Sequence, residues 1–493
     1  MKAPTVGAEP PSQAADTPTP PKGGSTRIRD TFIGPGLFLA MLLLPMEIPF
    51  PVRCGIGLLL WMTWWWITRP VHLAVTGFLP LVVAALLDFV PVGEILPSYA
   101  APLIILLLAA NVMTTLWERW GLDRRVALVS LLGVGTNTTR QIVVWFIMAM
   151  VLSAVLPNTI VAATMIPIVV AMLRFIGIED LWNSRVGTAL VLAVAWGTSA
   201  GGVTTPLGGA PNLITVQAVE ELTGEEFLFA TWVVRFLPLA LTAMIAMLIF
   251  VRFAFKPEIA EVPGSREYFR KELGALGRMT TPEKWGLALF SGATFLAFAR
   301  PLYASVFPSF SPPYAFLTFA VLCFLVRHRG EPILTWEYAQ AKMMWGLFYL
   351  FAGGTALGRV LTESGTATFL ADLLVPYARE GGIVAVVIFG LLTMLMTQTT
   401  SNTAAVAVTV PIAISTFQSL GLNPIPFVFI VTAIGNCGFV LPTSSGGTAV
   451  AAGYGVNLKT MLVKGSLASL MILVLFTLVG YLLAMFWPAF GTT

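Results

Sequence analysis

The sequence predicts an all-α polytopic membrane protein made of two inverted repeats that meet at a central site. Of its 493 residues, 57% are hydrophobic and 11% are charged, whereas a water-soluble domain carries roughly 25% charged residues. The apolar residues form repeated runs of about 17–25 residues, the length of a helix that crosses a bilayer. A motif in the first half also recurs in the second. The net charge of +4 then reflects the charged loops of a membrane protein, and we expect no nucleic-acid partner.

The chain divides into a tail, two halves and a linker. Residues 1–31 are rich in Pro, Ala, Thr, Gly and Ser and lack hydrophobic periodicity, so we expect a disordered cytoplasmic tail. The N-terminal half covers 32–255, a cytoplasmic linker covers 256–283 and the C-terminal half covers 284–490. We expect about eleven transmembrane helices, at 32–46, 50–67, 71–88, 98–118, 187–218, 231–254, 284–300, 312–326, 342–361, 427–457 and 462–487.

Two apolar helix pairs interrupt this series, at 139–176 and 382–420. We expect each pair to form a re-entrant hairpin, which returns to its own side of the membrane. Loop charge predicts the orientation, because Lys and Arg are retained in cytoplasmic segments. With the N-terminus in the cytoplasm and the C-terminus outside, 23 of the 28 Lys and Arg residues lie in cytoplasmic segments. The predicted location is the plasma (inner) membrane.

The internal repeat is carried by the pattern N-T-x7-P-I. It begins at Asn158-Thr159 and again at Asn402-Thr403, 244 residues later, and the hydroxyl residues Ser153 and Thr397 correspond at the same offset. Five crossings, an odd number, separate equivalent points, so the two halves are predicted to be inverted. Inverted repeats with interrupted helices are typical of secondary transporters, whose binding site lies at mid-membrane between the repeats.

Polar or Gly/Pro-rich breaks occur at membrane depth in four places. Two are the hairpin tips, 157–159 and 399–403, where Asn, Ser and Thr are suited to cap the helix that follows. The other two interrupt crossings, at 197–212 and 435–448. Such breaks free backbone carbonyls and helix N-termini, which is tolerated in a membrane only where protein or a ligand satisfies them.

Acidic residues are scarce around these breaks. Between residues 126 and 219 the only acids are Glu179 and Asp180, and none follows Glu380. A cation site must therefore use carbonyls, Asn amides and Ser or Thr hydroxyls, which suits Na⁺ better than H⁺ because none of these groups titrates. No Lys or Arg occurs at the breaks either, so we expect an anion to be held by helix N-termini and neutral donors.

These features resemble the divalent anion–sodium symporter (DASS) family, the carriers of dicarboxylates, citrate and sulfate. The family's Ser-Asn-Thr motif, present at each hairpin tip, is matched fully by Ser401-Asn402-Thr403 and at two of three positions by Asn158-Thr159. The resemblance covers about residues 32–490 and implies sodium-coupled uptake of a succinate- or malate-like dicarboxylate. It also implies a homodimer in which each protomer has a static scaffold and a sliding, elevator-type transport domain.

The resemblance further implies two sodium sites and one anion site. The first sodium site would use Ser153, Asn158 and backbone carbonyls around Gly201 and Gly202. The second would use Thr397, Thr400, Asn402 and the carbonyl near Ser444. The anion would contact Asn158, Thr159, Ser401, Asn402, Thr403 and Ser445.

The sequence departs from the family pattern at two places in the presumed anion pocket. Pro157 replaces the first serine, and Gly446-Gly447-Thr448 replaces the usual Pro-Pro-Asn. Transport of sulfate, citrate or another oxyanion, and exchange in place of symport, therefore stay open. We expect no enzyme, because a membrane enzyme would need an intramembrane carboxylate pair, a His/Asp pair or a metal cluster. A channel would need a continuous pore, against which two dead-end hairpins argue.

Overall fold

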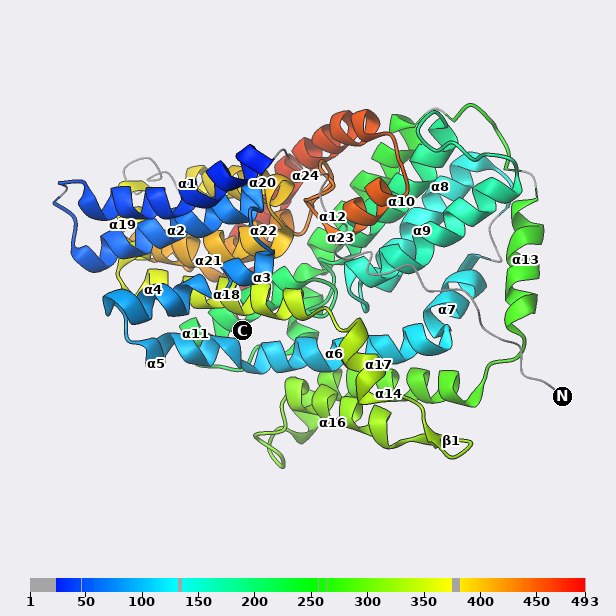
Figure 1. Ribbon diagram of the computed structural model, residues 1–493, viewed down its shortest axis with the longest axis horizontal. Helices are drawn as coiled ribbons and strands as arrows, with labels where there is room; N and C mark the ends of the chain where they lie inside the picture. The colour runs from blue at the N-terminus through cyan, green and yellow to red at the C-terminus, as the bar shows by residue number, and fades with distance from the viewer. Residues whose placement is uncertain are drawn as a thin grey trace.

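A computed structural model describes residues 24–492, except residues 46, 132–134, 256, 263 and 375–381. Most of the tail predicted at 1–31 therefore lies outside the described residues. The described chain is built almost wholly of helices. It also contains one short antiparallel hairpin of β1 (Arg327–His328) and β2 (Glu331–Pro332) (Figure 1).

The elements fall into four consecutive groups. The first group is α1 (Gly24–Leu43), α2 (Phe50–Thr68), α3 (Leu73–Thr76), α4 (Leu79–Leu87), α5 (Val92–Ile95) and the 3-10 helix η1 (Leu96–Tyr99). The second is α6 (Pro102–Trp120), α7 (Leu122–Leu131), α8 (Thr138–Ser153), α9 (Asn158–Phe175), α10 (Arg185–Gly201), α11 (Ala210–Thr223) and α12 (Phe229–Ala254). The third is α13 (Ser265–Leu276), α14 (Thr281–Phe298), α15 (Arg300–Tyr303), α16 (Pro312–Leu325), the two strands and α17 (Trp336–Lys342). The fourth is α18 (Trp345–Glu363), α19 (Thr366–Leu374), α20 (Ile383–Thr399), α21 (Asn402–Ser419), α22 (Ile425–Gly435), α23 (Gly446–Gly453), α24 (Leu458–Phe486) and the 3-10 helix η3 (Pro488–Gly491).

The second and fourth groups are the internal repeat. Helices α9 and α21 both have 18 residues, begin 244 positions apart and carry an internal proline at the same register, Pro167 and Pro411. Helices α7 and α19 also begin 244 positions apart. The series α6 to α12 thus recurs as α18 to α24, and the repeat predicted from the N-T-x7-P-I pattern is confirmed in the secondary structure.

The two predicted interruptions are confirmed as well. Helix α10 ends at Gly201 and α11 begins at Ala210, while α22 ends at Gly435 and α23 begins at Gly446. The disorder predicted for residues 24–31 was wrong, because helix α1 begins at Gly24. The cytoplasmic linker predicted at 256–283 stays a prediction, and it contains α13. The single crossing predicted at 71–88 is divided into α3 and α4.

The chain between α3 and α4 lies very close to the backbone of α18. A Cβ atom on Gly77, between α3 and α4, would lie 2.3 Å from the carbonyl oxygen of Tyr349 in α18. Only glycine lets the two chains meet this closely. The absence of a side chain at Gly77 therefore allows the first group of helices to pack on α18, the first helix of the second repeat.

The helices have the character of membrane spans. By length and composition, four described segments could cross a membrane, namely Val92–Trp120, Asn158–Phe175, Phe229–Ala254 and Leu458–Phe486. Five further apolar helices have 10–17 residues, so the count of about eleven transmembrane helices stays a prediction. Helix α24 exposes a stripe of large apolar side chains at helical spacing, as a helix facing lipid does: Leu467, Leu470, Val474, Leu478 and Leu482.

The packing of the two repeats positions the site. Helix α23 of the second repeat packs against α9 and α10 of the first, and α11 of the first packs against α21 and α22 of the second (Figure 1). Each repeat therefore inserts the short helix that follows its interruption into the other repeat. As a result, both hairpin tips and both interruptions lie in the interface between the repeats, while α14 and α16 pack on the far end of the structure against α6.

Candidate functional site

The first tip gathers oxygen atoms around Asn158. The side-chain amide of this residue touches the Ser153 hydroxyl, and the same corner of the amide lies 3.1 Å from the carbonyl oxygen of Thr198 and 2.8 Å from that of Gly208. With its NH₂ group at this corner, the amide donates to all three oxygens. If the Asn158 amide is rotated by 180° about its Cβ–Cγ bond, its Oδ1 takes the place of the NH₂ group and joins the three other oxygens. The three partners come from α8, α10 and the interruption after α10.

The two glycines predicted for this site have different positions. A Cβ atom on Gly202 would lie 3.0 Å from Nδ2 of Asn158, so this glycine makes room for the amide. A Cβ atom on Gly201 would lie 2.1 Å from the carbonyl oxygen of Met150, so Gly201 permits α10 to pack on α8. The carbonyls of Gly201 and Gly202 accept from the Thr204 N–H and from Asn212, respectively. The carbonyls that reach Asn158 are those of Thr198 and Gly208, which the sequence did not indicate.

The second tip gathers oxygen atoms around Asn402 in the same way. The Thr397 hydroxyl lies 2.7 Å from Oδ1 of Asn402 and 2.6 Å from the carbonyl oxygen of Gly435. A Cβ atom on Gly438 would lie 2.7 Å from Oδ1 of Asn402 and 2.6 Å from the carbonyl oxygen of Ser444. Oδ1 of Asn402 is thus close to the Thr397 hydroxyl on one side and to the position of a Gly438 side chain, beside the Ser444 carbonyl, on the other. Thr397, Asn402, Gly435 and Ser444 are all buried.

The remaining residue predicted for the second sodium group is oriented differently. The hydroxyl of Thr400 donates to the carbonyl of Met396 at 2.8 Å, one turn back along α20. Its oxygen is therefore engaged with its own helix, as threonine hydroxyls in helices often are. Among the described contacts, the carbonyl of Thr400 instead accepts from Arg69.

The residues predicted for the anion lie at the starts of three helices. Ser401 is the N-cap of α21, where its hydroxyl accepts from the N–H of Ala404 at 3.2 Å. Ser445 is the N-cap of α23 and forms a reciprocal capping box with Thr448. Asn158 and Thr159 are the first two residues of α9, and Thr403 is the second residue of α21. Helix starts expose N–H groups and partial positive charge, which attract anions.

These helix starts are in direct contact across the repeats. A Cβ atom on Gly446 would lie 1.9 Å from Oγ1 of Thr159, and one on Gly447 would lie 2.5 Å from Oγ1 of Thr198. No side chain fits at either position, so proline in the family's usual Pro-Pro-Asn is excluded by the packing of α23 on α9 and α10. The Gly446-Gly447 departure therefore belongs to the interface between the two repeats.

Two buried asparagines outside the predicted site connect the interruptions. Asn212, in the first turn of α11, donates to the carbonyls of Gly202 and Thr205 at 2.6 and 2.7 Å. Asn436, at the end of α22, donates to Oδ1 of Asn212 at 2.8 Å. The carbonyl of Asn436 in turn accepts from Nδ2 of Asn402 at 2.8 Å. The two tips therefore belong to one hydrogen-bonded cluster, although their asparagines come from different repeats.

A cationic side chain, missed by the sequence analysis, reaches the second tip. Arg69, just after α2, donates through Nη2 to the carbonyl of Thr400 at 2.9 Å and to that of Thr443 at 3.1 Å. Its backbone has a φ of 52°, the left-handed conformation that is uncommon outside glycine. The expectation that no Lys or Arg lies at the breaks was wrong, because Arg69 is close to them only in space. In sequence it looked like an ordinary basic residue at the cytoplasmic end of a crossing.

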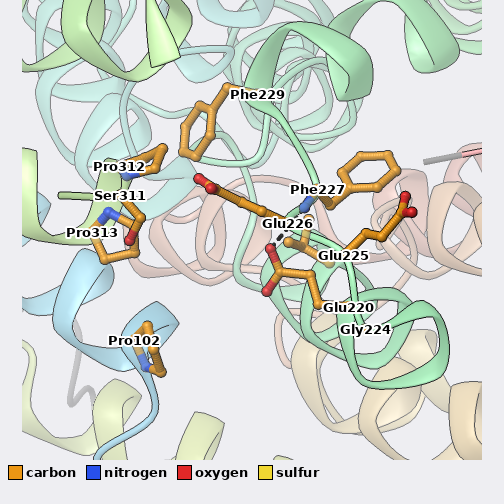
Figure 2. Close-up of a pocket in the computed structure, with 11 residues that line it drawn as sticks. Pro102, Glu220, Gly224, Glu225, Glu226, Phe227, Phe229, Ser311, Pro312 and Pro313 are labelled. Carbon is orange, nitrogen blue, oxygen red and sulfur yellow. Dashed lines mark hydrogen bonds between the residues drawn. The ribbon is translucent and has the colours of Figure 1, made fainter. Parts of the chain in front are cut away.

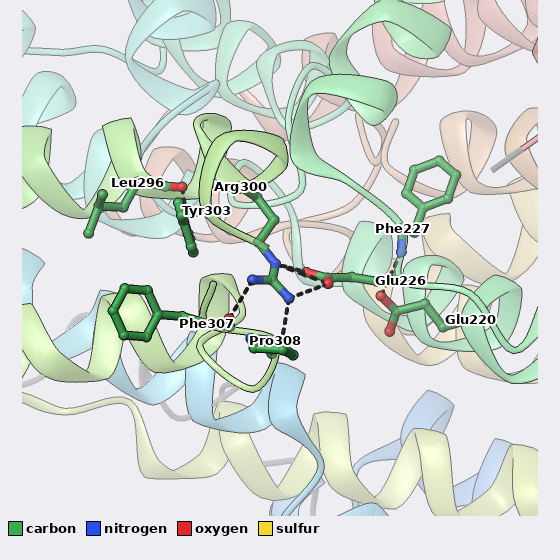
Figure 3. Close-up of polar contacts among 8 residues, drawn as sticks. All are labelled: Glu220, Glu226, Phe227, Leu296, Arg300, Tyr303, Phe307 and Pro308. Atoms are coloured by element: carbon green, nitrogen blue, oxygen red, sulfur yellow. Dashed lines mark hydrogen bonds and ion pairs between the residues drawn. The ribbon is translucent and has the colours of Figure 1, made fainter. Parts of the chain in front are cut away.

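A separate pocket of about 320 Å³ lies away from this cluster. It is bordered by Pro102 of α6, by residues 311–313, by Glu220 of α11, and by Glu225 and Glu226 from the loop between α11 and α12 (Figure 2). Glu226 is paired with Arg300, whose Nη2 lies 2.8 Å from its Oε2 and whose guanidinium also donates to the carbonyls of Phe307 and Pro308 (Figure 3). A pocket lined by glutamates repels a dianion, and it contains none of the predicted site residues.

Comparison with known proteins identifies the family of this chain. The family model described as the sodium:sulfate symporter transmembrane region matches residues 32–492. The sodium-dependent dicarboxylate transporter SdcS of Staphylococcus saprophyticus is 30% identical over 471 residues, which cover 92% of this chain and 90% of that protein. SdcS of Staphylococcus aureus is 27% identical over 470 residues, covering 91% of this chain and 89% of that protein.

Among solved structures, the YdaH transporter of Alcanivorax borkumensis shares the fold. It aligns with a TM-score of 0.53 at 15% sequence identity, over 90% of this chain and 100% of that one. The family model and the SdcS relatives both extend over nearly the whole chain. The chain is therefore a member of the sodium:sulfate symporter family, the family that the Ser-Asn-Thr motif and the paired interruptions had indicated.

Proposed function

We propose that the protein carries a small divalent anion into the cell together with sodium, and that its substrate is a dicarboxylate of the succinate or malate class. The observation that carries the proposal is the pair of oxygen groups, one around Asn158 and one around Asn402. Each combines a hydroxyl, an Asn amide and backbone carbonyls. Such groups suit Na⁺, and relatives over nearly the full chain are named sodium-dependent dicarboxylate transporters.

The geometry supports a simple reason why cation and anion bind together. An Asn amide has an acceptor at one corner and donors at the other. A sodium ion at the oxygen of Asn158 or Asn402 leaves the adjoining helix start and the remaining amide hydrogens for a carboxylate. At Asn402 one amide hydrogen already goes to the carbonyl of Asn436. A dianion alone would be costly to bring into a site of low dielectric constant, whereas neighbouring sodium ions offset its charge. Sodium binding therefore prepares the anion site.

We place the rest of the predicted arrangement within the same proposal. The N-terminus lies in the cytoplasm, as the charge distribution indicates. Helices α8–α9 and α20–α21 act as re-entrant hairpins, and the interface cluster moves as part of an elevator-type transport domain in a homodimer. The support for a moving unit is that both tips and both interruptions share one hydrogen-bonded cluster.

The test is uptake by the purified protein in proteoliposomes with an imposed inward Na⁺ gradient. Labelled succinate, citrate and sulfate are offered in turn, and K⁺ replaces Na⁺ in the control. We expect succinate to accumulate only with the Na⁺ gradient, and a proton gradient of the same size to drive no uptake. If sulfate alone moves, the substrate class is wrong. If succinate moves only against an internal dicarboxylate, the protein is an exchanger.

A further inference from the structure

Asn436 is held in one orientation at the centre of the interface between the repeats. The residue is fully buried. Its Nδ2 donates to Oδ1 of Asn212 at 2.8 Å and to the carbonyl of Thr432 at 2.9 Å, so both amide hydrogens are used. Turning the amide by 180° would bring its oxygen against two acceptors. The direction of Oδ1 is therefore fixed by these two bonds.

The oxygen atom of the same amide is unpaired. Oδ1 of Asn436 is buried and accepts no hydrogen bond from any residue that the structure describes. Buried amide oxygens nearly always have a partner, because leaving one without a donor costs its hydration. Two of its neighbours are glycines that have no side chain to offer, Gly202 and Gly209.

This oxygen points toward the first tip. A Cβ atom on Gly202 would lie 3.4 Å from Oδ1 of Asn436, and it would lie 3.0 and 3.1 Å from the two polar atoms of the Asn158 amide. The unpaired oxygen and Asn158 therefore lie on the same side of Gly202. A Cβ atom on Gly209 would lie only 2.4 Å from the same oxygen, so the absence of side chains at both glycines keeps this space open.

The backbone of Asn436 serves the second tip at the same time. Its carbonyl accepts from Nδ2 of Asn402 at 2.8 Å, and this bond directs Oδ1 of Asn402 toward the Thr397 hydroxyl. One residue thus faces the first oxygen group with its side chain and orients the second with its main chain.

We infer that Asn436 is a shared ligand of the site: its Oδ1 coordinates the cation held at Asn158, although Asn158 belongs to the other repeat. This inference rests on the proposed sodium-coupled function and adds a ligand to it. Coordination would fix Asn436 and, through its carbonyl, the Asn402 amide. The cation at the first tip then favours cation binding at the second, and the dependence of uptake on sodium is cooperative.

The experiment measures the sodium dependence of two properties, succinate uptake in proteoliposomes and the melting temperature of the full-length protein in detergent, with choline replacing Na⁺. Asn436→Ser is compared with Thr432→Val. Thr432 lies one turn earlier on α22, and its hydroxyl contacts that of Thr215 on α11. The control therefore weakens the same interface without touching either tip.

We expect Asn436→Ser to raise the half-saturating sodium concentration about tenfold or more, as the loss of one ligand does, and to lower the Hill coefficient toward 1. Thr432→Val should leave both values as in the wild type. If Asn436→Ser lowers only the melting temperature in choline and leaves the sodium dependence unchanged, its oxygen is satisfied by water and the inference is overturned. A wild type without any response to sodium would instead overturn the proposed function.

A second variant, Asn436→Asp, tests the shared ligand if Asn436→Ser does not fold. In Asn436→Asp, a protonated carboxyl can replace both the donor toward Asn212 and the acceptor toward the first tip. Its ionisation as the pH rises would place a negative charge beside the cation. We expect the half-saturating sodium concentration of this variant to fall between pH 5 and pH 8, while that of the wild type stays constant. A variant with no such pH dependence would contradict the shared ligand, because a purely structural residue has no reason to change it.

Discussion

The hydroxyl of Thr397 lies 2.7 Å from Oδ1 of Asn402, five residues further along the chain and beyond the turn of the hairpin. Ser153 and Asn158 have the same spacing at the other tip, where the Ser153 hydroxyl also touches the Asn158 amide. In each repeat, the last turn of one helix therefore holds the amide that starts the next. This pair of a hydroxyl and an amide is the smallest unit of the proposed sodium sites. A single substitution can remove its hydroxyl oxygen and keep the shape of the side chain.

Thr397→Val keeps the shape of the side chain and removes its oxygen. We expect the half-saturating sodium concentration for uptake to rise about tenfold, because one of the few ligands is lost. Thr409→Val is the matched control, since Thr409 is equally buried in α21 and its hydroxyl only donates to Ala405 of its own helix. Sodium titrations of both variants check the prediction. Equal curves for the two would show that the Thr397 hydroxyl is not a ligand.

We expect Arg69 to affect the affinity for the anion more than the affinity for sodium. Its guanidinium holds the carbonyls of Thr400 and Thr443 beside the Ser401 tip, where its charge favours a dianion. We expect Arg69→Gln to raise the KM for succinate about tenfold, as for the loss of a charge-assisted hydrogen bond, and Arg69→Lys to do so less.

The control for this prediction is Arg53→Gln. Arg53 lies near the start of α2, the helix that ends just before Arg69, and donates to the carbonyl of Leu42 at 3.0 Å. A KM that is unchanged in Arg69→Gln, or that rises equally in Arg53→Gln, would argue against a role of Arg69 at the site.

Pro157 stands where the family pattern has serine, and it forms the N-cap of α9 without a side-chain hydrogen bond. Pro157→Ser would add a hydroxyl beside the start of α9, and serine is a favoured N-cap. We expect the ratio of succinate to sulfate and citrate uptake to change. Competition measurements with the three anions test this, and an unchanged profile would place Pro157 outside the anion pocket.

We expect Glu220 to make the stability of the protein depend on pH. The residue lies beyond the crossing predicted at 187–218, and burial raises its pKa from 4.5 to about 7. The folded protein therefore keeps a proton that the unfolded chain loses, so the free energy of unfolding falls as the pH rises from about 4.5 to about 7. Glu220→Gln should make the melting temperature nearly independent of pH over this range. Glu221→Gln, at the exposed neighbour, should not. If the melting temperature changes with pH at the same rate in the wild type, Glu220→Gln and Glu221→Gln, this assignment is contradicted.

The parts of the site that the sequence predicted are the local ones. The tips, the two interruptions and the pairing of Ser153 with Asn158 and Thr397 with Asn402 depend on residues close together in the chain, where capping and repeat patterns can be read. Arg69, Asn212 and Asn436 take their positions from contacts between elements far apart in sequence, such as the bond from Arg69 to Thr443. Thr198 and Gly208 contribute only backbone carbonyls. Since every residue type has a carbonyl, the sequence could not indicate these two.

The same distinction applies to the fold. Long apolar runs predicted most helices, because composition alone distinguishes them. The close approach of Gly77 to Tyr349 could not be predicted, since the two residues are far apart in sequence and belong to different groups of helices. The glycines at 446 and 447 looked like a loss of anion contacts, and the reason for them appears only when Thr159 and Thr198 are seen to fill the space.

The most direct measurement is sodium-driven succinate uptake by Asn158→Ala and Asn402→Ala in proteoliposomes, beside the wild type and Thr409→Val. Both asparagine variants should remain folded, with wild-type melting temperatures in sodium-free buffer, and should take up succinate no faster than empty vesicles. Uptake at the wild-type rate by either variant would contradict a transport site built on the two amides.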